Sequence, residues 1–200
     1  AEIKKDEVLG NLAYPALIWV ERAQPKRDFH VNIGPSLHLS WVLDRIAGDQ
    51  ATFQSMFETN VHTIETQKEH RKNTIIYHLM KYFLEIDDWA EHMERPENKA
   101  RALKELGEVY ETYPGKMVVA SQVLRSADDW IDAARHVVSQ YFEDGVRELH
   151  LQIEPAEFEK YPGTLHDILD RLETILELEE NKAKSRFGGY HRVRLALRMS

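Results

Sequence analysis

The sequence predicts an α/β fold built around a parallel sheet. Three short segments alternate between apolar and polar residues, as strands with two unlike faces do. Longer segments with helical periodicity separate them. The order strand, long helical region, strand, helix, strand is typical of a parallel sheet, because parallel neighbours need a crossover connection between them.

The first predicted strand covers residues 28–33, where polar Asp28, His30 and Asn32 alternate with apolar neighbours. A Gly34-Pro35 pair follows and ends the pattern. Residues 1–24 precede this strand and are interpreted as an N-terminal extension.

Residues 37 to about 145 have a helical pattern, and 48–125 are predicted to be a mostly helical insertion. Two apolar stripes repeat at spacings of three and four. They consist of Phe53, Met56, Phe57, Val61 and Ile64, and of Ile75, Ile76, Leu79, Met80, Phe83 and Trp89. Pro96 is expected in the first turn of a further helix. Ser126 and Asp129 form an acidic variant of a capping box, which predicts a helix that ends near Gly145.

Alternation returns in residues 146–155, which predict the second strand, with His150, Gln152 and Glu154 on its polar face. Thr164 and Asp167 are expected to cap the next helix, and Gly188-Gly189 end the connection. Residues 191–200 predict the third strand.

Each predicted strand keeps one polar face. Strands of a parallel sheet that is covered on both sides read instead as nearly continuous apolar runs. In a barrel with a polar interior, the apolar residues point to the surrounding helices and the polar residues converge inside. The alternative is a sheet whose polar face is an edge or is solvated.

Composition limits the classes of function. The formal net charge of −8 disfavours nucleic acid as the main partner, since no excess of cations attracts phosphates. Cysteine is absent, which leaves histidine, aspartate and glutamate as metal ligands. The apolar stretch 12–20 is about half of the ~20 residues that a membrane span needs. We therefore expect a cytoplasmic protein without a membrane partner.

Three segments resemble the adenosine deaminase family, which includes AMP and adenine deaminases and belongs to the amidohydrolase superfamily. Residues 25–37 read PKRDFHVNIGPSL, similar to the family's first strand, P-K-x-E-L-H-x-H-L-D-G-S-L. Residues 144–155 read DGVRELHLQIEP, similar to its second strand, D-G-V-x-Y-x-E-x-R-x-x-P. Residues 193–198, VRLALR, resemble the strand that follows a long second helix.

The resemblance implies a partial (β/α)8 barrel of the TIM type in residues 25–200, comprising its first three strands, with the helical insertion between strands one and two. It implies zinc as cofactor and hydrolytic deamination of adenosine or a related purine nucleoside or nucleotide. By position, His30 is expected to bind zinc, Asn32 stands where a second ligand histidine would be, and Ser36 and His150 are candidate substrate-binding residues. Three strands cannot close such a barrel, which typically needs about 250 residues. The catalytic residues are therefore expected downstream of residue 200.

Several positions depart from the family pattern. Asn32 is a far poorer zinc ligand than histidine. Gly34 and Pro35 replace an aspartate and a glycine that hold the nucleoside, and His150 and Gln152 stand where glutamate and arginine are usual. The alternative function is therefore a catalytically inactive, deaminase-like module for ligand binding or scaffolding. The insertion is also compatible with a homo-oligomer or larger assembly.

The arginines of the third strand and the histidines of the insertion are not expected to belong to a metal site. Arg192, Arg194 and Arg198 are expected to form ion pairs with carboxylates inside the barrel, or to contact a phosphate if the ligand is a nucleotide. His62, His70, His78 and His92 are interpreted as part of a solvated helix face, because the Glu-x-x-His motif of di-iron bundles is absent.

Overall fold

The computed structural model describes residues 26–66, 74–155, 158, 161, 163 and 165–197. It contains a parallel sheet in the order β1-β2-β3, formed by β1 (Lys26–Asn32), β2 (Val146–Ile153) and β3 (Arg192–Leu197). The predicted α/β class and the three predicted strands are confirmed. A three-stranded open sheet is compatible both with the first strands of a barrel and with a complete sheet layer. The barrel therefore stays a prediction.

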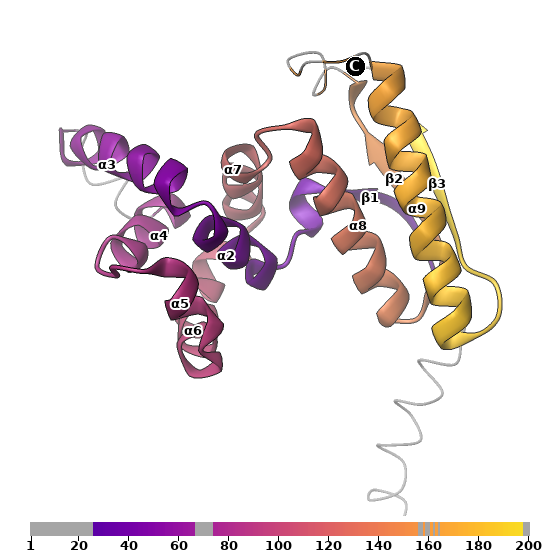
Figure 1. Cartoon of the computed structure of the whole chain (residues 1–200), viewed down its shortest axis with the longest axis horizontal. Coiled ribbons are helices and arrows are strands. Elements are labelled where there is room, and N and C mark those ends of the chain that lie inside the picture. Colours follow the sequence, from indigo (N-terminus) through magenta and orange to yellow (C-terminus); the bar gives the residue numbers. More distant parts are fainter. Residues whose placement is uncertain are drawn as a thin grey trace, which may run out of the picture.

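Most of the described chain is helical. Between β1 and β2 the described residues form η1 (Gly34–Ser36) and seven helices, and α9 (Leu165–Phe187) lies between β2 and β3 (Figure 1). The seven are α2 (Leu39–Gly48), α3 (Gln50–Thr66), α4 (Ile75–Phe83), α5 (Trp89–Glu94), α6 (Pro96–Tyr110), α7 (Tyr113–Val123) and α8 (Ala127–Glu143). The part of the chain that the structure describes includes no helix with the length and apolarity of a membrane span.

The helix starts follow from local hydrogen bonding. The Ser126 hydroxyl accepts a hydrogen bond from the Asp129 backbone N–H at 3.1 Å, which confirms the predicted cap of α8. Thr74, Asp88 and Thr112 cap α4, α5 and α7 in the same way. Pro96 occupies the first turn of α6, as predicted, where its missing N–H costs no bond. Thr164, the predicted cap of α9, lies outside the described residues.

The register of the sheet separates its two faces. Val31, Leu151 and Leu195 are cross-strand partners, whereas the next residues, Asn32, Gln152 and Ala196, are partners on the opposite face. Leu149, Leu151 and Ile153 are fully buried, because α8 and α9 pack against this apolar face (Figure 1). The polar residues of the strands therefore lie on the face away from α8 and α9.

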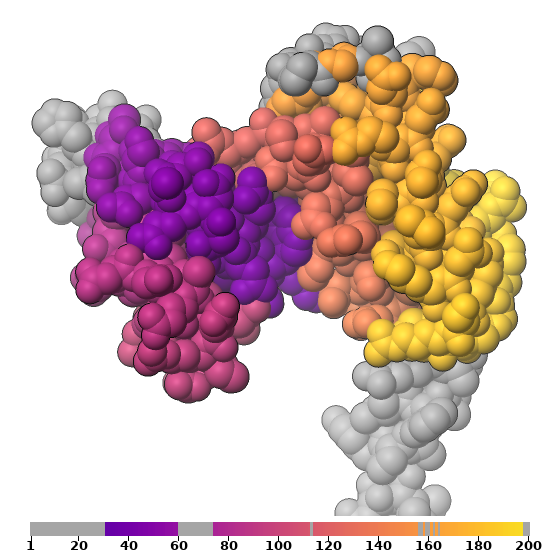
Figure 2. Space-filling view, viewed as in Figure 1, coloured from indigo at the N-terminus to yellow at the C-terminus, as the bar shows by residue number. Residues whose placement is uncertain are grey.

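We call β1–β3 with α8 and α9 the sheet unit, and α2–α7 the helical unit. The helical unit is centred on Trp89, whose ring centroid lies 4.8 Å from that of Phe83 and 5.9 Å from that of Phe57. All three rings are buried. Figure 2 shows α2–α6 gathered in one lobe and α9 with β3 in another, with α8 between them.

Two contacts fix the helical unit to the end of β1. The Tyr110 hydroxyl of α6 donates a 2.7 Å hydrogen bond to the carbonyl of Leu37, just after η1. A Cβ at Gly34 would lie 3.0 Å from the Cβ of Ala120 in α7. Gly34 therefore lets η1 lie directly against α7, and the helical unit sets the path of the chain that leaves β1.

Candidate functional site

The predicted site residues lie on β1, η1 and β2. Asn32 is the last residue of β1, Ser36 ends η1, and His150 lies in the middle of β2; all three are half-buried. His30 belongs to β1, but its side chain lies outside the described part of the structure. The structure brings Asn32 and the polar face of β2 onto one surface, since Asn32 and Gln152 are register partners.

Three rows of side chains cross this polar face, and we number them in strand direction. Row 1 contains Glu148 and Arg192, and row 2 contains His150 and Arg194. Row 3 contains Asn32, Gln152 and Ala196. Row 3 lies at the carboxyl ends of the strands, where ligands bind in open α/β sheets and in barrels.

Rows 1 and 2 carry charge that is largely paired. A carboxylate oxygen of Glu148, Oε1, lies 3.3 Å from Arg194 Nη2 and 3.8 Å from His150 Nε2. The Glu148 side chain is only 13% exposed, so the guanidinium offsets part of the cost of burying this carboxylate. Arg194 thus forms an ion pair with a strand carboxylate, as expected, while the interior of a barrel stays a prediction.

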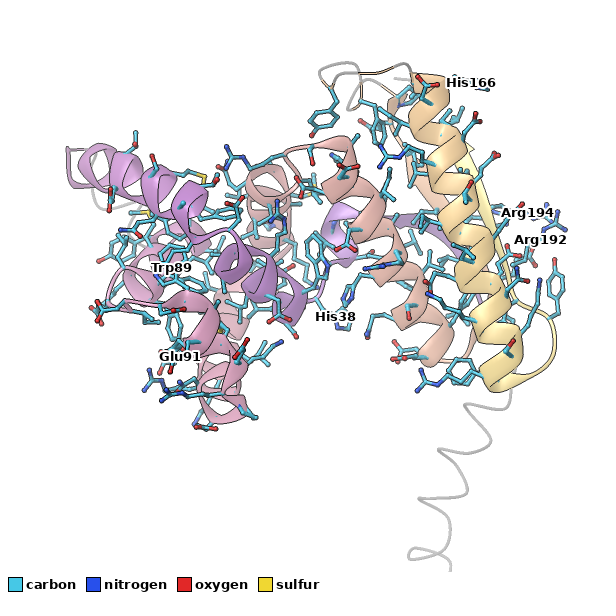
Figure 3. The ribbon with its side chains drawn as sticks, in the orientation of Figure 1. His38, Trp89, Glu91, His166, Arg192 and Arg194 are labelled. Atoms are coloured by element: carbon cyan, nitrogen blue, oxygen red, sulfur yellow. The ribbon has the colours of Figure 1, made fainter. Side chains whose placement is uncertain are left out.

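The two other strand arginines differ from Arg194. Arg192 Nη1 donates to the Tyr190 hydroxyl at 3.3 Å, and Arg192 and Arg194 lie together at the outer edge of β3 (Figure 3). Arg198 lies outside the described residues. The arginines are thus associated with rows 1 and 2, away from the carboxyl end of the sheet.

The described side chains do not fit a zinc centre. Among the described side chains, which lie within residues 31–59, 74–155 and 165–197, no group of three or more His, Asp or Glu residues is arranged to hold a metal ion. At the end of β1, Asn32 offers an amide, which is a weak ligand for zinc. Row 3 supplies amides and a methyl group instead of imidazoles or carboxylates.

The structure gives a packing reason for one departure from the deaminase pattern. Gly34 is buried, and a side chain there would be crowded, because its Cβ would lie only 3.0 Å from the Cβ of Ala120. Pro35 occupies the first turn of η1. Ser36 donates its backbone N–H to the carbonyl of Ile33 at 3.1 Å, so the chain turns sharply after β1. These residues shape the turn beside row 3.

A polar cavity that the sequence did not predict lies between α4, α5 and α6. Its volume is about 620 Å³. His92 Nε2 lies 3.2 Å from the Tyr82 hydroxyl on its wall. Burial, together with the nearby Arg101 and Arg95, lowers the pKa of His92. His78 and His92 are half-buried and line this cavity, so the predicted solvated face is only partly exposed. His62 and His70 lie outside the described side chains.

A second histidine cluster lies where the two units meet. The ring of His136 stacks on Trp41 with centroids 6.0 Å apart and meets the edge of His38 at 5.9 Å. His38 lies at the start of α2, facing α8 (Figure 3). Burial lowers the pKa of His136, so the neutral imidazole is favoured there. The described side chains add no third potential metal ligand to these two histidines.

His191 is fully buried at the start of β3. Its ring lies between Phe142 and Phe187, with centroid distances of 5.0 and 6.1 Å. Arg147 donates to the His191 ring and, at 3.0 Å, to the carbonyl of Gly188. Burial and this guanidinium lower the pKa of His191. The contact fixes the turn from α9 into β3 and does not reach the polar face.

Comparison of the chain with protein-family models, with curated proteins and with solved structures gave no match.

Proposed function

We propose that this chain supplies the first strands of a deaminase-like barrel, and that the full-length polypeptide deaminates adenosine or a related purine nucleoside or nucleotide by hydrolysis. One observation carries the proposal: a parallel sheet with helices on its apolar face and polar residues in register on the other. This arrangement is typical of a barrel whose interior holds a polar site, because the apolar faces of its strands point to the surrounding helices.

The described residues provide positioning for this chemistry. In hydrolytic deamination, water adds to the carbon that bears the amino group, and ammonia leaves after proton transfer. Asn32 and Gln152 would orient the base at the carboxyl end of the sheet, above the Glu148 and Arg194 pair. The residues that transfer protons are proposed to lie on strands beyond residue 200.

Zinc remains part of the proposal only through the resemblance, with His30 as the residue proposed to bind it. The described side chains do not bring a ligand set together, so no step of the reaction is derived through the metal. Cytoplasmic location is proposed from the composition, and assembly into a homo-oligomer from the helical insertion, whose boundaries 48–125 are also proposed.

The second candidate function is a non-catalytic module that binds a purine ligand or acts as a scaffold. Asn32 favours it, because an amide at the position of a metal ligand keeps hydrogen bonding and weakens metal binding. Both candidates use the same polar face, and metal content distinguishes them.

The test is metal analysis of the full-length polypeptide combined with an ultraviolet assay for conversion of adenosine to inosine. Both are measured before and after Asn32→His. Stoichiometric zinc with turnover in either form supports the deaminase. Absence of zinc and of turnover in both forms, with the fold retained by circular dichroism, contradicts the deaminase and supports the non-catalytic module.

A further inference from the structure

We propose that Asn32 and Gln152 form an amide pair that recognises the hydrogen-bonding edge of the purine base. This inference rests on the proposed function and names the part of the ligand that row 3 binds. In this inference Asn32 binds the purine base and does not bind a metal ion.

The first argument is position. Asn32 and Gln152 are register partners on neighbouring parallel strands, and such strands lie about 4.8 Å apart. Their side chains therefore point to the same face within reach of one small planar ligand. Both residues lie at the carboxyl ends of their strands, which is the edge where α/β sheets bind ligands.

The second argument is hydrogen-bonding chemistry. Each amide presents an acceptor oxygen and donor hydrogens side by side. Adenine presents amino hydrogens next to a ring nitrogen that accepts, and Asn and Gln pair with this pattern through two hydrogen bonds. Two adjacent amides match the base better than they match a metal ion or a phosphate group, which carry charge.

The third argument is the chemistry around the pair. Ala196 is the register partner of Gln152 on β3 and carries only a methyl group. The ion pair of Glu148 with Arg194, at 3.3 Å, lies in rows 1 and 2, and the carboxylate of Glu154 follows two residues after Gln152. The three side chains of row 3 itself are uncharged, as suits a neutral heterocycle that must lose its water on binding.

The experiment measures binding of adenosine and of 6-methylpurine riboside by calorimetry, with a zinc chelator present so that adenosine is not consumed. The second ligand has the same shape but a methyl group in place of the amino donor. The full-length polypeptide should bind adenosine about 10-fold more tightly. Asn32→Leu and Gln152→Met should each remove most of this preference, because adenosine loses two hydrogen bonds to the amide whereas the methyl analogue, which keeps only the ring acceptor, loses one.

Gln122→Met on α7 is the matched control, because it removes a glutamine amide away from the polar face and should keep the preference. If the unaltered polypeptide binds both ligands equally, the amide pair is wrong, and this outcome needs no variant to fold. If it prefers adenosine but neither variant changes that preference, the base is bound elsewhere and only this inference fails. If it binds neither ligand, the proposed purine function fails as well.

Discussion

The helical unit and the sheet unit are held together by different kinds of contact. The helical unit buries Phe53, Phe57, Phe83 and Trp89, which come from helices close together in the sequence. The sheet unit pairs Lys26 with Val146, so its first two strands meet across the whole helical unit. Local contacts form at low entropic cost, whereas distant pairing must also close a long loop. The polar face proposed to bind the ligand therefore depends on the helical unit being folded.

The two units are joined through Asp129 at the start of α8. Arg45 of α2 donates from Nη2 to Asp129 Oδ1 at 2.7 Å. The other carboxylate oxygen accepts from the Arg125 backbone N–H at 3.0 Å and from the Ser126 hydroxyl at 2.9 Å. The Asp129 side chain is only 9% exposed. One buried carboxylate thus anchors α2 and closes the cap of α8.

The largest expected effect comes from Asp129→Ala. It leaves Arg45 without this carboxylate and removes the bonds to the cap, which should lower the free energy of unfolding by about 3 kcal/mol. Urea unfolding followed by circular dichroism measures the loss. The rate of backbone hydrogen exchange should also increase more in α2 and at the start of α8 than in β2.

Asp128→Ala is the matched control for this change. Asp128 lies in the same helical turn, pairs with Arg171 and is 77% exposed, so its loss should cost at most about 1 kcal/mol. Equal effects of the two substitutions would show that Asp129 does not join the units.

The fold was predicted well where the pattern is local. Alternation in β2 and the apolar spacing along α8 depend on residues only a few positions apart, and each element begins and ends close to where it was predicted. The same holds for the Ser126 cap, which is formed within one helical turn. The periodicity of apolar residues and the capping of a helix each depend on a short stretch of chain, so both can be predicted from the sequence.

The site was predicted less completely, because it depends on register and on packing between helices. That Asn32 lies beside Gln152 follows from the alignment of strands more than a hundred residues apart, which no local pattern specifies. The cavity at Tyr82 and His92 requires three helices to be placed together. How far a histidine on an amphipathic helix is buried depends on the position of the neighbouring helix, which residue spacing within one helix does not specify.

The second prediction concerns pH and includes both units. Burial lowers the pKa of His92 in the helical unit, of His136 at the joint and of His191 in the sheet unit. The unfolded chain, with histidine pKa values near 6.5, then binds more protons than the folded chain. Stability from these histidines is complete above about pH 6.5 and falls as the pH is lowered towards the folded pKa values.

Urea midpoints between pH 7.5 and pH 5 measure this loss, and His191→Gln tests how it is divided. Glutamine keeps an acceptor for Arg147 but does not titrate, so the variant should lose less stability on acidification than the unaltered chain. If His191→Gln loses as much stability between pH 7.5 and pH 5 as the unaltered chain, the acid sensitivity comes from His92 and His136. If the urea midpoint of the unaltered chain does not change with pH, the lowered histidine pKa values do not affect stability.

The smallest expected effects have opposite signs in the two units. Gly107 lies within α6, and a Cβ there would meet nothing within 4 Å, so Gly107→Ala should stabilise the helical unit by about 0.5 to 1 kcal/mol. Gly189 adopts a φ of +73° in the turn from α9 to β3, where an L side chain is strained, so Gly189→Ala should cost about 1 kcal/mol. Urea unfolding of both variants measures the difference. If both substitutions change the free energy of unfolding in the same direction, the backbone conformation of Gly189 does not govern the turn before β3. The contacts of Arg147 with this turn would then be what fixes it.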